Sequence, residues 1–382
     1  MIVQQRTYVG GLGWSQPLPA ELDSAQTLVL IFASSALLNP PHTMLTDLQQ
    51  TFPQAILFGA STQAAISGGE MMTERGVVAV CRFEKTKLAT TLQSITTSAE
   101  SYVTGMTLAK KLWRPDLTLL MVLADDTVID VNELMRGLNS VLPPSVRVTG
   151  GLAGHLDHAT GRRVVVAKEG AGPHIAAAVG LYGDALRVSQ VYSGGWQDRS
   201  GVYEVTRAEG RVLYELNHRP AAEVYRQFLG SLASYLTEAL QHIFPVGFYD
   251  HPDQKVRVVR SVLGVDEATG GLLFPAEVPS SRYLRFMLGL PSQFIDSAAA
   301  SAENAVQQFG FAGTTLAVMV SCIGRYIAMQ DDAAKEAQKA FTKLGPHTTQ
   351  IGFYGHGEIA PSAAGGSELH NHTVNITLLG EL

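Results

Sequence analysis

The residues best suited to chemistry lie near the end of the chain. His370 and His372 flank Asn371, and alternate residues of a strand point to one face, so both imidazoles can approach one ligand. Two imidazoles supply only half of a metal site. Three nearby residues offer a further ligand: His356, Glu358 and Glu368. The alternatives are a polar binding pocket and a strand edge whose histidines are satisfied by neighbours.

Two charged residues, Arg325 and Glu358, follow the two strands of one expected strand–helix–strand unit. Neighbouring strand ends would bring them together as a charge-assisted pair. Such a pair either satisfies itself or grips an amino-acid-like ligand. A third interpretation adds His356 and makes these residues the catalytic groups of an enzyme acting on a small substrate.

Polar and glycine residues follow the apolar strands of all three such units. The carboxyl ends of parallel strands are where ligand crevices form in α/β sheets. If the units stack in register, these residues enclose one cavity; otherwise each glycine serves a turn and each polar group faces water. The candidate ligand-binding residues are Ser61, Thr62, Gly154, His155, Arg325, Tyr354, His356, Glu358, His370 and Asn371.

The histidines make haem a possible cofactor. Non-covalent haem needs an apolar slot and one axial imidazole, and the chain has no Cys-x-x-Cys-His attachment motif. The candidate axial ligands are His155, His158, His356 and His372.

Nucleophile chemistry is weakly indicated. Cys322 has Arg325 three residues on but no identifiable base, so a buried structural cysteine is the preferred interpretation. The sequence around Ser61 lacks the final glycine of a nucleophile elbow. Asp125 and Asp126 end a strand, where they suit a cation or, more simply, the N-cap of a helix beginning near Val131.

The elements that position these residues form a threefold repeat. Continuous apolar runs predict strands buried on both faces, and 3.6-residue spacing predicts the intervening helices. A short connection of this kind gives parallel pairing. The expected units are strand 27–34, helix 44–52 and strand 55–62; strand 118–125, helix 131–141 and strand 146–151; and strand 315–321, helix 332–344 and strand 350–356.

Alternating sequences after each unit predict antiparallel, half-covered strands over 77–83, 175–182, 186–192 and 372–379. A long amphipathic helix over 221–243 follows Pro220 and is expected to mark the join between two halves. The fold class is therefore mixed α/β, with parallel and antiparallel sheets in two intimately associated domains, 1–220 and 221–382.

Composition narrows the function classes. The 382 residues carry a net charge of −6, which disfavours a broad nucleic-acid or anionic-membrane surface. Two cysteines are too few for a disulfide framework. The N-terminus lacks a signal-peptide pattern and no apolar run has the length of a membrane span, so a cytoplasmic protein is expected.

Several stretches resemble the FIST family in its form with N-terminal and C-terminal domains. They run through nearly the whole chain in the family's order: 150–154, 179–184, 195–196, 209–216, 219–221, 263–267, 321–325, 352–354, 357–359 and 368–371. The resemblance implies a sensory protein that binds small ligands and regulates signalling. Part of the family resembles haem-containing nitric-oxide sensors that act on histidine kinases or cyclic-di-GMP enzymes.

Three positions depart from the family pattern, and each introduces a histidine. His155 stands where an acidic residue is usual, Gly355-His356 replaces a pair such as Ser-Tyr, and His372 stands where glutamine is common. These changes favour the haem alternative.

The expected function is thus a sensor that binds a small ligand and regulates a separate histidine kinase, diguanylate cyclase or phosphodiesterase. The alternatives are a haem nitric-oxide sensor and the enzyme using Glu358, His356 and Arg325. Self-association is a further expectation about partners.

Overall fold

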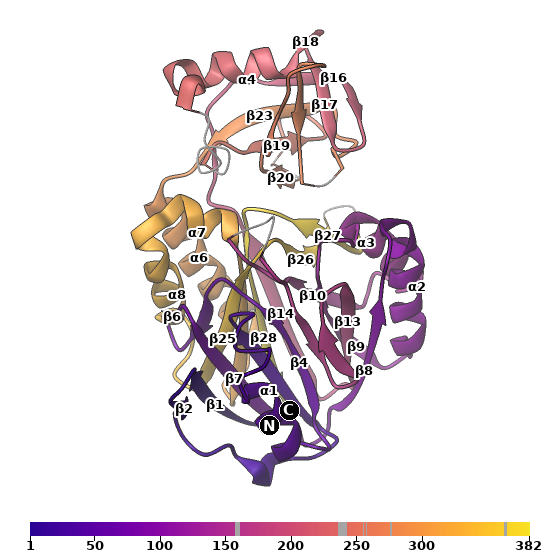
Figure 1. Cartoon of the computed structure of the whole chain (residues 1–382), viewed down its shortest axis with the longest axis vertical. Coiled ribbons are helices and arrows are strands. Elements are labelled where there is room, and N and C mark those ends of the chain that lie inside the picture. The colour runs from indigo at the N-terminus through magenta and orange to yellow at the C-terminus, as the bar shows by residue number, and fades with distance from the viewer. Residues whose placement is uncertain (157–160, 236–242, 255, 257, 276, 363–364) are drawn as a thin grey trace.

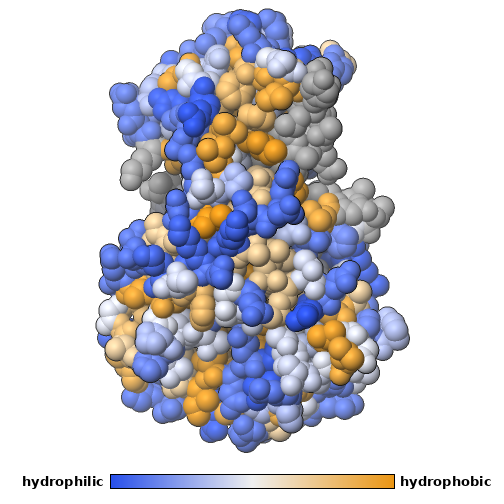
Figure 2. Space-filling view, turned by 90° about the vertical axis from the view of Figure 1, so that its left-hand side faces the viewer, coloured by the Kyte–Doolittle hydropathy of each residue, from blue (hydrophilic) through white to orange (hydrophobic). Residues whose placement is uncertain are grey.

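The computed structural model describes residues 1–156, 161–235, 243–254, 256, 258–275, 277–362 and 365–382. Its chain forms two parts, one above the other in Figure 1. We call residues 197–288 the insert lobe, because they lie between two neighbouring elements of the lower part, β14 (Leu186–Ser193) and α6 (Pro291–Phe309). The rest of the chain is the main body. Figure 2 shows the same two parts from the side, with hydrophobic side chains gathered on one face of the insert lobe.

The main body contains three sheets, each built around one of the repeated units. The first sheet has the order β12 (Gly170–Gly172), β11 (Val165–Ala167), β4 (Ile56–Ser61), β3 (Thr27–Ala33), β7 (Arg75–Arg82), β1 (Ile2–Val9) and β2 (Gly13–Trp14). The second has the order β27 (Ser367–His370), β26 (Glu358–Pro361), β10 (Arg147–Leu152), β9 (Leu117–Ala124), β13 (Ile175–Tyr182) and β8 (Lys87–Ser94). The third has the order β14, β28 (Val374–Glu381), β24 (Thr315–Cys322), β25 (Thr348–Gly355), β5 (Ala65–Ser67) and β6 (Glu70–Met72).

The threefold repeat is confirmed. Strands β3 and β4, β9 and β10, and β24 and β25 pair in parallel. The helices between them are α1 (Met44–Thr51), α3 (Val131–Asn139) and α8 (Ala333–Phe341), the last preceded by α7 (Ile323–Met329). The mixed α/β class is also confirmed, because antiparallel strands flank every parallel pair.

The three sheets meet in one common hydrophobic core. Phe32, Met121 and Phe353 show the pattern, since each comes from a different sheet and all lie in the same buried cluster. The opposite face of each sheet packs under its own helices: α1 on the first sheet, α2 (Ser101–Leu112) with α3 on the second, and α6 with α8 on the third. Each sheet is therefore covered on both faces.

This double cover corrects one expectation about the antiparallel strands. They pair as predicted, but every residue of β13 and β28 is buried, and β7 exposes only its two ends. Only β14 is half-covered along most of its length. The alternating pattern predicted that one face of each strand would contact solvent, but helices packed on the outer faces of the sheets bury that face.

The insert lobe is mainly antiparallel sheet. Its strands are β15 (Gln197–Asp198), β16 (Tyr203–Glu209), β17 (Val212–Leu216), β18 (Arg219–Pro220), β19 (Val246–Tyr249), β20 (Val258–Arg260), β21 (Gly264–Asp266), β22 (Gly271–Leu273) and β23 (Tyr283–Leu288). Its helix α4 (Ala221–Leu229) begins after Pro220 as predicted but is shorter than expected. Gly230, with φ +58°, ends it, and a 3-10 turn over Gly230–Tyr235 follows. Residues 236–242 of the expected helix lie outside the described part of the chain.

Distant parts of the sequence share sheets in the main body. For example, β5 pairs with β25, and β26 pairs with β10. The division into residues 1–220 and 221–382 stays a prediction; in space it falls inside the insert lobe, between β18 and α4. Among the described residues, no helix combines the length and apolar character that crossing a membrane requires.

Candidate functional site

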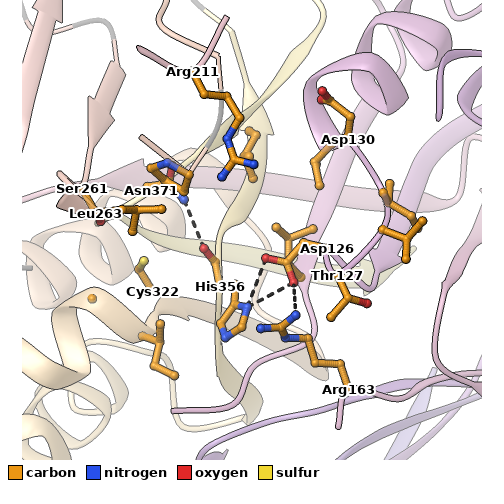
Figure 3. A pocket seen from close by; sticks show the side chains of 18 of the residues that line it. Asp126, Thr127, Asp130, Arg163, Arg211, Ser261, Leu263, Cys322, His356 and Asn371 are labelled. Atoms are coloured by element: carbon orange, nitrogen blue, oxygen red, sulfur yellow. Dashed lines mark hydrogen bonds and ion pairs between the residues drawn. The ribbon is translucent and has the colours of Figure 1, made fainter. Parts of the chain in front are cut away.

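A cavity of about 800 Å³ lies where the insert lobe meets the main body. Its main-body wall comes from strand ends, because Asp126 follows β9, Cys322 ends β24 and His356 follows β25 (Figure 3). Its other wall belongs to the insert lobe and includes Arg211 and Ser261. The cavity therefore lies at the carboxyl ends of the parallel strands of two of the three units, the edge at which the sequence predicted a crevice.

The first unit contributes indirectly. The hydroxyl of Ser61, at the end of β4, accepts the N–H of Val164 at 2.9 Å, and the N–H of Ser61 donates to the carbonyl of Val164 at 2.7 Å. This pairing fixes the neighbouring Arg163 in the cavity wall. The polar end of β4 therefore positions Arg163 in the cavity wall, although Ser61 itself does not line the cavity.

The centre of the main-body wall is a network of three side chains (Figure 3). Nδ1 of His356 lies 3.1 Å from both carboxylate oxygens of Asp126, and Nη1 of Arg163 lies 3.4 Å from Oδ1 of the same carboxylate. The side chains of His356 and Arg163 are 2% and 4% exposed, while that of Asp126 is 24% exposed. Asp126 is consequently the member of the network that can meet a ligand.

The second ring nitrogen of His356 is also engaged. Nε2 lies 3.1 Å from the backbone nitrogen and 2.9 Å from the carbonyl oxygen of His155. A neutral ring that donates Nδ1–H to Asp126 accepts the N–H of His155, whereas a protonated ring donates to the His155 carbonyl. Both ring nitrogens of His356 therefore have a partner within the protein.

The helix α3 forms a neighbouring part of the wall. Asp130 is its N-cap, because its carboxylate accepts the N–H groups of Asn132 at 3.0 Å and Glu133 at 3.2 Å. The sequence indicated this cap but assigned it to the pair Asp125 and Asp126. Asp125 instead accepts the N–H groups of Thr127 and His174 at 2.9 and 2.7 Å.

Polar contacts join the two lobes beside the cavity. Nη1 of Arg260 donates to the carbonyl of Leu369 and to Oδ1 of Asn371, both at 3.2 Å. Asn371 in turn donates to the carbonyl of His356 at 3.1 Å, and Ser261 hydrogen-bonds Nε2 of His372. The His356 segment is therefore tied to the insert lobe through Asn371.

A buried acid lies behind the cavity wall. Burial raises the pKa of Glu358 to about 8, although the Thr373 hydroxyl at 2.5 Å and backbone N–H at 3.1 Å oppose that rise. The Cys322 thiol interacts with the same carboxyl group. Burial and the nearby Glu358 raise the pKa of Cys322 well above its ordinary value, so this thiol does not present a thiolate to the cavity.

Comparison with known families identifies the family to which the chain belongs. The FIST N domain matches residues 27–219, and the FIST C domain matches residues 221–361. The chain belongs to the FIST family. FIST domains are associated with small-ligand sensing in signal transduction.

Similar proteins occur in mycobacteria and in Methanocaldococcus jannaschii. The chain is 25% identical over 363 residues to the uncharacterized protein Mb0898c of Mycobacterium bovis, covering 93% of this chain and 90% of that protein. It is 25% identical over 369 residues to the uncharacterized protein Rv0628c of Mycobacterium tuberculosis, covering 92% and 90%. The uncharacterized protein MJ1623 of Methanocaldococcus jannaschii is 27% identical over 219 residues, covering 54% and 41%.

Four of the predicted ligand-binding residues come together in this FIST protein, but they bind one another. The Thr62 hydroxyl donates to the carbonyls of Ala64 and Tyr354, each at 2.8 Å, and Gly154 donates its N–H to the Ser61 carbonyl at 2.9 Å. A Cβ at Gly154 would lie 2.4 Å from the Tyr354 carbonyl oxygen. Ser61, Thr62, Gly154 and Tyr354 therefore lock the three units together.

The expected pairing of Arg325 with Glu358 is wrong. Arg325 bonds Glu336 through Nε at 2.8 Å and Nη2 at 2.5 Å, and both side chains are fully buried. Ser321 and Tyr354 also donate to Glu336, at 2.8 and 2.9 Å. Glu336 lies on α8 and faces inward. The prediction considered only residues that follow neighbouring strands, so it did not include this helical residue.

His370 and His372 do not face one ligand. His370 contacts the carbonyl of Pro361 at 3.2 Å and the ring of Tyr192, with ring centres 4.5 Å apart. His372 has φ +58°, which breaks the strand alternation on which the prediction rested, and its ring packs against Trp196 with centres 5.0 Å apart. Of the predicted site residues, His356 and Asn371 line the cavity, and His155 supports His356 through its backbone.

Two of the predicted haem ligands, His356 and His372, are held by protein groups. Both ring nitrogens of His356 and Nε2 of His372 are engaged with protein groups. Within the described ranges, no group of three His, Cys, Asp or Glu residues is placed to hold a metal ion. His158 lies outside the described residues.

Sequence reasoning missed the charged residues on both sides of the cavity, Arg163 and Arg211. Nothing in their local sequence marks them, because Arg163 depends on the backbone pairing with Ser61 and Arg211 on the position of the insert lobe. Asp130 carried a detectable signal, since an aspartate followed three residues later by Glu133 is typical of a helix start.

Proposed function

We propose that this FIST protein senses a small polar ligand bound in the cavity between the insert lobe and the main body. The observation that carries the proposal is that both parts of the chain line this one cavity. A ligand that touches both walls stabilises the arrangement in which both contact it, and so shifts the population of lobe arrangements.

The site has the composition of a small-ligand pocket. Its volume of about 800 Å³ falls within the range of known ligand sites. Its polar groups are oriented in advance, because His356 and Arg163 hold the carboxylate of Asp126 from behind. Preorganised groups lose little conformational entropy when a ligand binds.

The signal would pass to a separate protein. The family resemblance points to a histidine kinase or a cyclic-di-GMP enzyme as that partner, and the surface presented by the insert lobe is the part that ligand binding would move. The contacts do not support the enzyme alternative. Its three residues occupy separate sets of contacts, with Arg325 on Glu336, Glu358 on Thr373 and His356 on Asp126.

The test starts from the purified protein and a panel of metabolites. We expect at least one polar metabolite to raise the melting temperature, and mass spectrometry of the protein isolated under mild conditions to detect a bound compound. Leu263→Trp places a larger side chain in the cavity wall and should abolish the shift. Leu232→Trp, at another exposed leucine of the insert lobe outside the cavity, is the matched control.

Two results would contradict the proposal. The first is a metabolite panel in which no compound stabilises the protein. The second is a stabilising compound whose effect is the same in Leu263→Trp as in Leu232→Trp, because its site would then lie elsewhere.

A further inference from the structure

The charges that line the cavity are unequally balanced. On the main-body wall, Arg163 and His356 both contact the carboxylate of Asp126, so the charge of Arg163 is compensated locally. The carboxylate of Asp130 is occupied by the amides of the first turn of α3. Among the described residues of the cavity, Arg211 is the one arginine without an acidic partner.

The side chain of Arg211 is anchored at its base and open at its tip. Its Nε donates to the carbonyl of Phe274 at 3.0 Å, and the N–H of Phe274 donates back to the Arg211 carbonyl at 3.0 Å. Neither Nη atom has a partner among the described residues. Figure 3 shows the guanidinium group extending from the insert lobe into the cavity, toward Asn371 and Asp126.

We infer that the ligand carries an anionic oxygen group, a carboxylate or a phosphate, and that Arg211 binds this group through its two Nη atoms. The inference rests on the proposed function and adds the chemical class of the ligand. A guanidinium fork matches two oxygen atoms of a carboxylate or phosphate, and the resulting hydrogen bonds are among the strongest in proteins.

The position of Arg211 links recognition to lobe arrangement. The arginine belongs to the insert lobe, whereas the partly exposed carboxylate of Asp126 belongs to the main body. A ligand with an anionic group at one end and a hydrogen-bond donor at the other can bridge the two. Only a molecule that carries both the anionic group and the donor can contact both lobes, and so shift the population of lobe arrangements most strongly.

The experiment compares anionic compounds with uncharged counterparts of the same skeleton. Glycerate is paired with glyceramide, and glycerol 3-phosphate is paired with glycerol, so the two arms separate a carboxylate source from a phosphate source, and each anion also carries hydroxyl donors for Asp126. Binding is measured by calorimetry and thermal shift on the full chain at low ionic strength. We expect an anionic member to bind and its uncharged counterpart to bind at least about tenfold more weakly.

Variants assign the effect to Arg211. Arg211→Ala should weaken binding of the anion about 10- to 100-fold, and Arg211→Lys, which keeps the charge but lacks the fork, should fall between. The matched control is Arg187→Ala, an exposed arginine of β14 that pairs with Gly380 near the C-terminus. Circular dichroism and the melting temperature without ligand show whether each variant is folded.

The outcomes separate this inference from the proposed function. Binding of no anionic probe, equal binding by Arg211→Ala and Arg187→Ala, or equal binding of charged and uncharged compounds would each overturn the role of Arg211. An uncharged compound that binds the wild type and is blocked by Leu263→Trp would leave the sensor proposal standing without an anionic ligand. Failure of every compound, charged or uncharged, would remove both.

Discussion

Asp126 and His356 lie 230 positions apart in the sequence, yet Nδ1 of His356 is 3.1 Å from each carboxylate oxygen of Asp126. The contact joins the end of β9 in the second sheet to the end of β25 in the third. Arg163 reaches the same carboxylate from beside the first sheet. One aspartate thus links side chains that belong to or adjoin all three sheets at the wall of the cavity.

Replacing this aspartate should reduce both stability and ligand binding. Asp126→Asn removes the negative charge that faces the buried Arg163 and leaves one acceptor oxygen, in place of two, for Nδ1–H of His356. We expect the free energy of unfolding to fall by about 2 kcal/mol, since the aspartate is partly exposed. Urea unfolding measures the change. Asp184→Asn, in an exposed turn, should change stability by less than about 0.5 kcal/mol, and equal effects in the two variants would disprove the role of the network.

The buried pair of Arg325 and Glu336 should matter for stability alone. Glu336→Gln leaves a fully buried guanidinium without its counter-charge, which should cost about 3 to 5 kcal/mol. The control is Glu303→Gln, because Glu303 on the same side of the body forms an exposed pair with Lys343 at 3.5 Å. Its loss should cost less than about 1 kcal/mol. Comparable costs in urea unfolding would show that burial does not govern these pairs.

Glu358 should make the protein less stable as the pH rises. Its pKa is about 8 in the folded chain and 4.5 as an ordinary glutamate, so between these values the folded state holds more protons than the unfolded state. The free energy of unfolding therefore falls through this window, by at most about 1.4 kcal/mol per pH unit. Glu358→Gln should flatten the fall between pH 6.5 and 8, and an unchanged slope would contradict the raised pKa.

His370 should act in the opposite direction at lower pH. Burial, with a contribution from nearby Arg260, lowers its pKa from 6.5 to about 4. Between these values the unfolded state binds more protons, so the free energy of unfolding rises with pH and the gain is complete above pH 6.5. His370→Asn should remove this rise. The measurement compares slopes from urea unfolding at several pH values, and a variant slope equal to that of the wild type would refute the shift.

Cys322 should be unreactive although it lines the cavity. Burial raises the pKa of this thiol and of the buried Cys81, so little thiolate forms in either near neutral pH. At pH 8, alkylation by iodoacetamide should be at least about tenfold slower in the folded protein than in urea. Rapid alkylation that mass spectrometry maps to Cys322 would reveal an activated thiol and restore the nucleophile hypothesis.

The local sequence pattern was sufficient to predict secondary structure wherever residues close in the sequence determine it. The apolar runs of β3, β9 and β24 predicted buried parallel strands, and the helices between the paired strands were found where 3.6-residue spacing indicated them. The helix after Pro220 was predicted too long because Gly230 ends it. His372 escaped prediction because its positive φ depends on the tertiary packing around it.

The sequence by itself determined the family, the mixed α/β class, the three repeated units and the edge of the sheets at which a cavity would form. These follow from periodicity and strand order, which are properties of short segments. Only the tertiary structure decided that Arg325 pairs with Glu336, that Ser61, Gly154 and Tyr354 lock together, and that Arg211 meets Asp126 across a cavity. Arg325 and Glu336 are 11 residues apart and meet only because α8 packs back against the end of β24. The other pairings join segments far apart in the chain, and no local pattern records which side chains the packed sheets and the insert lobe bring together.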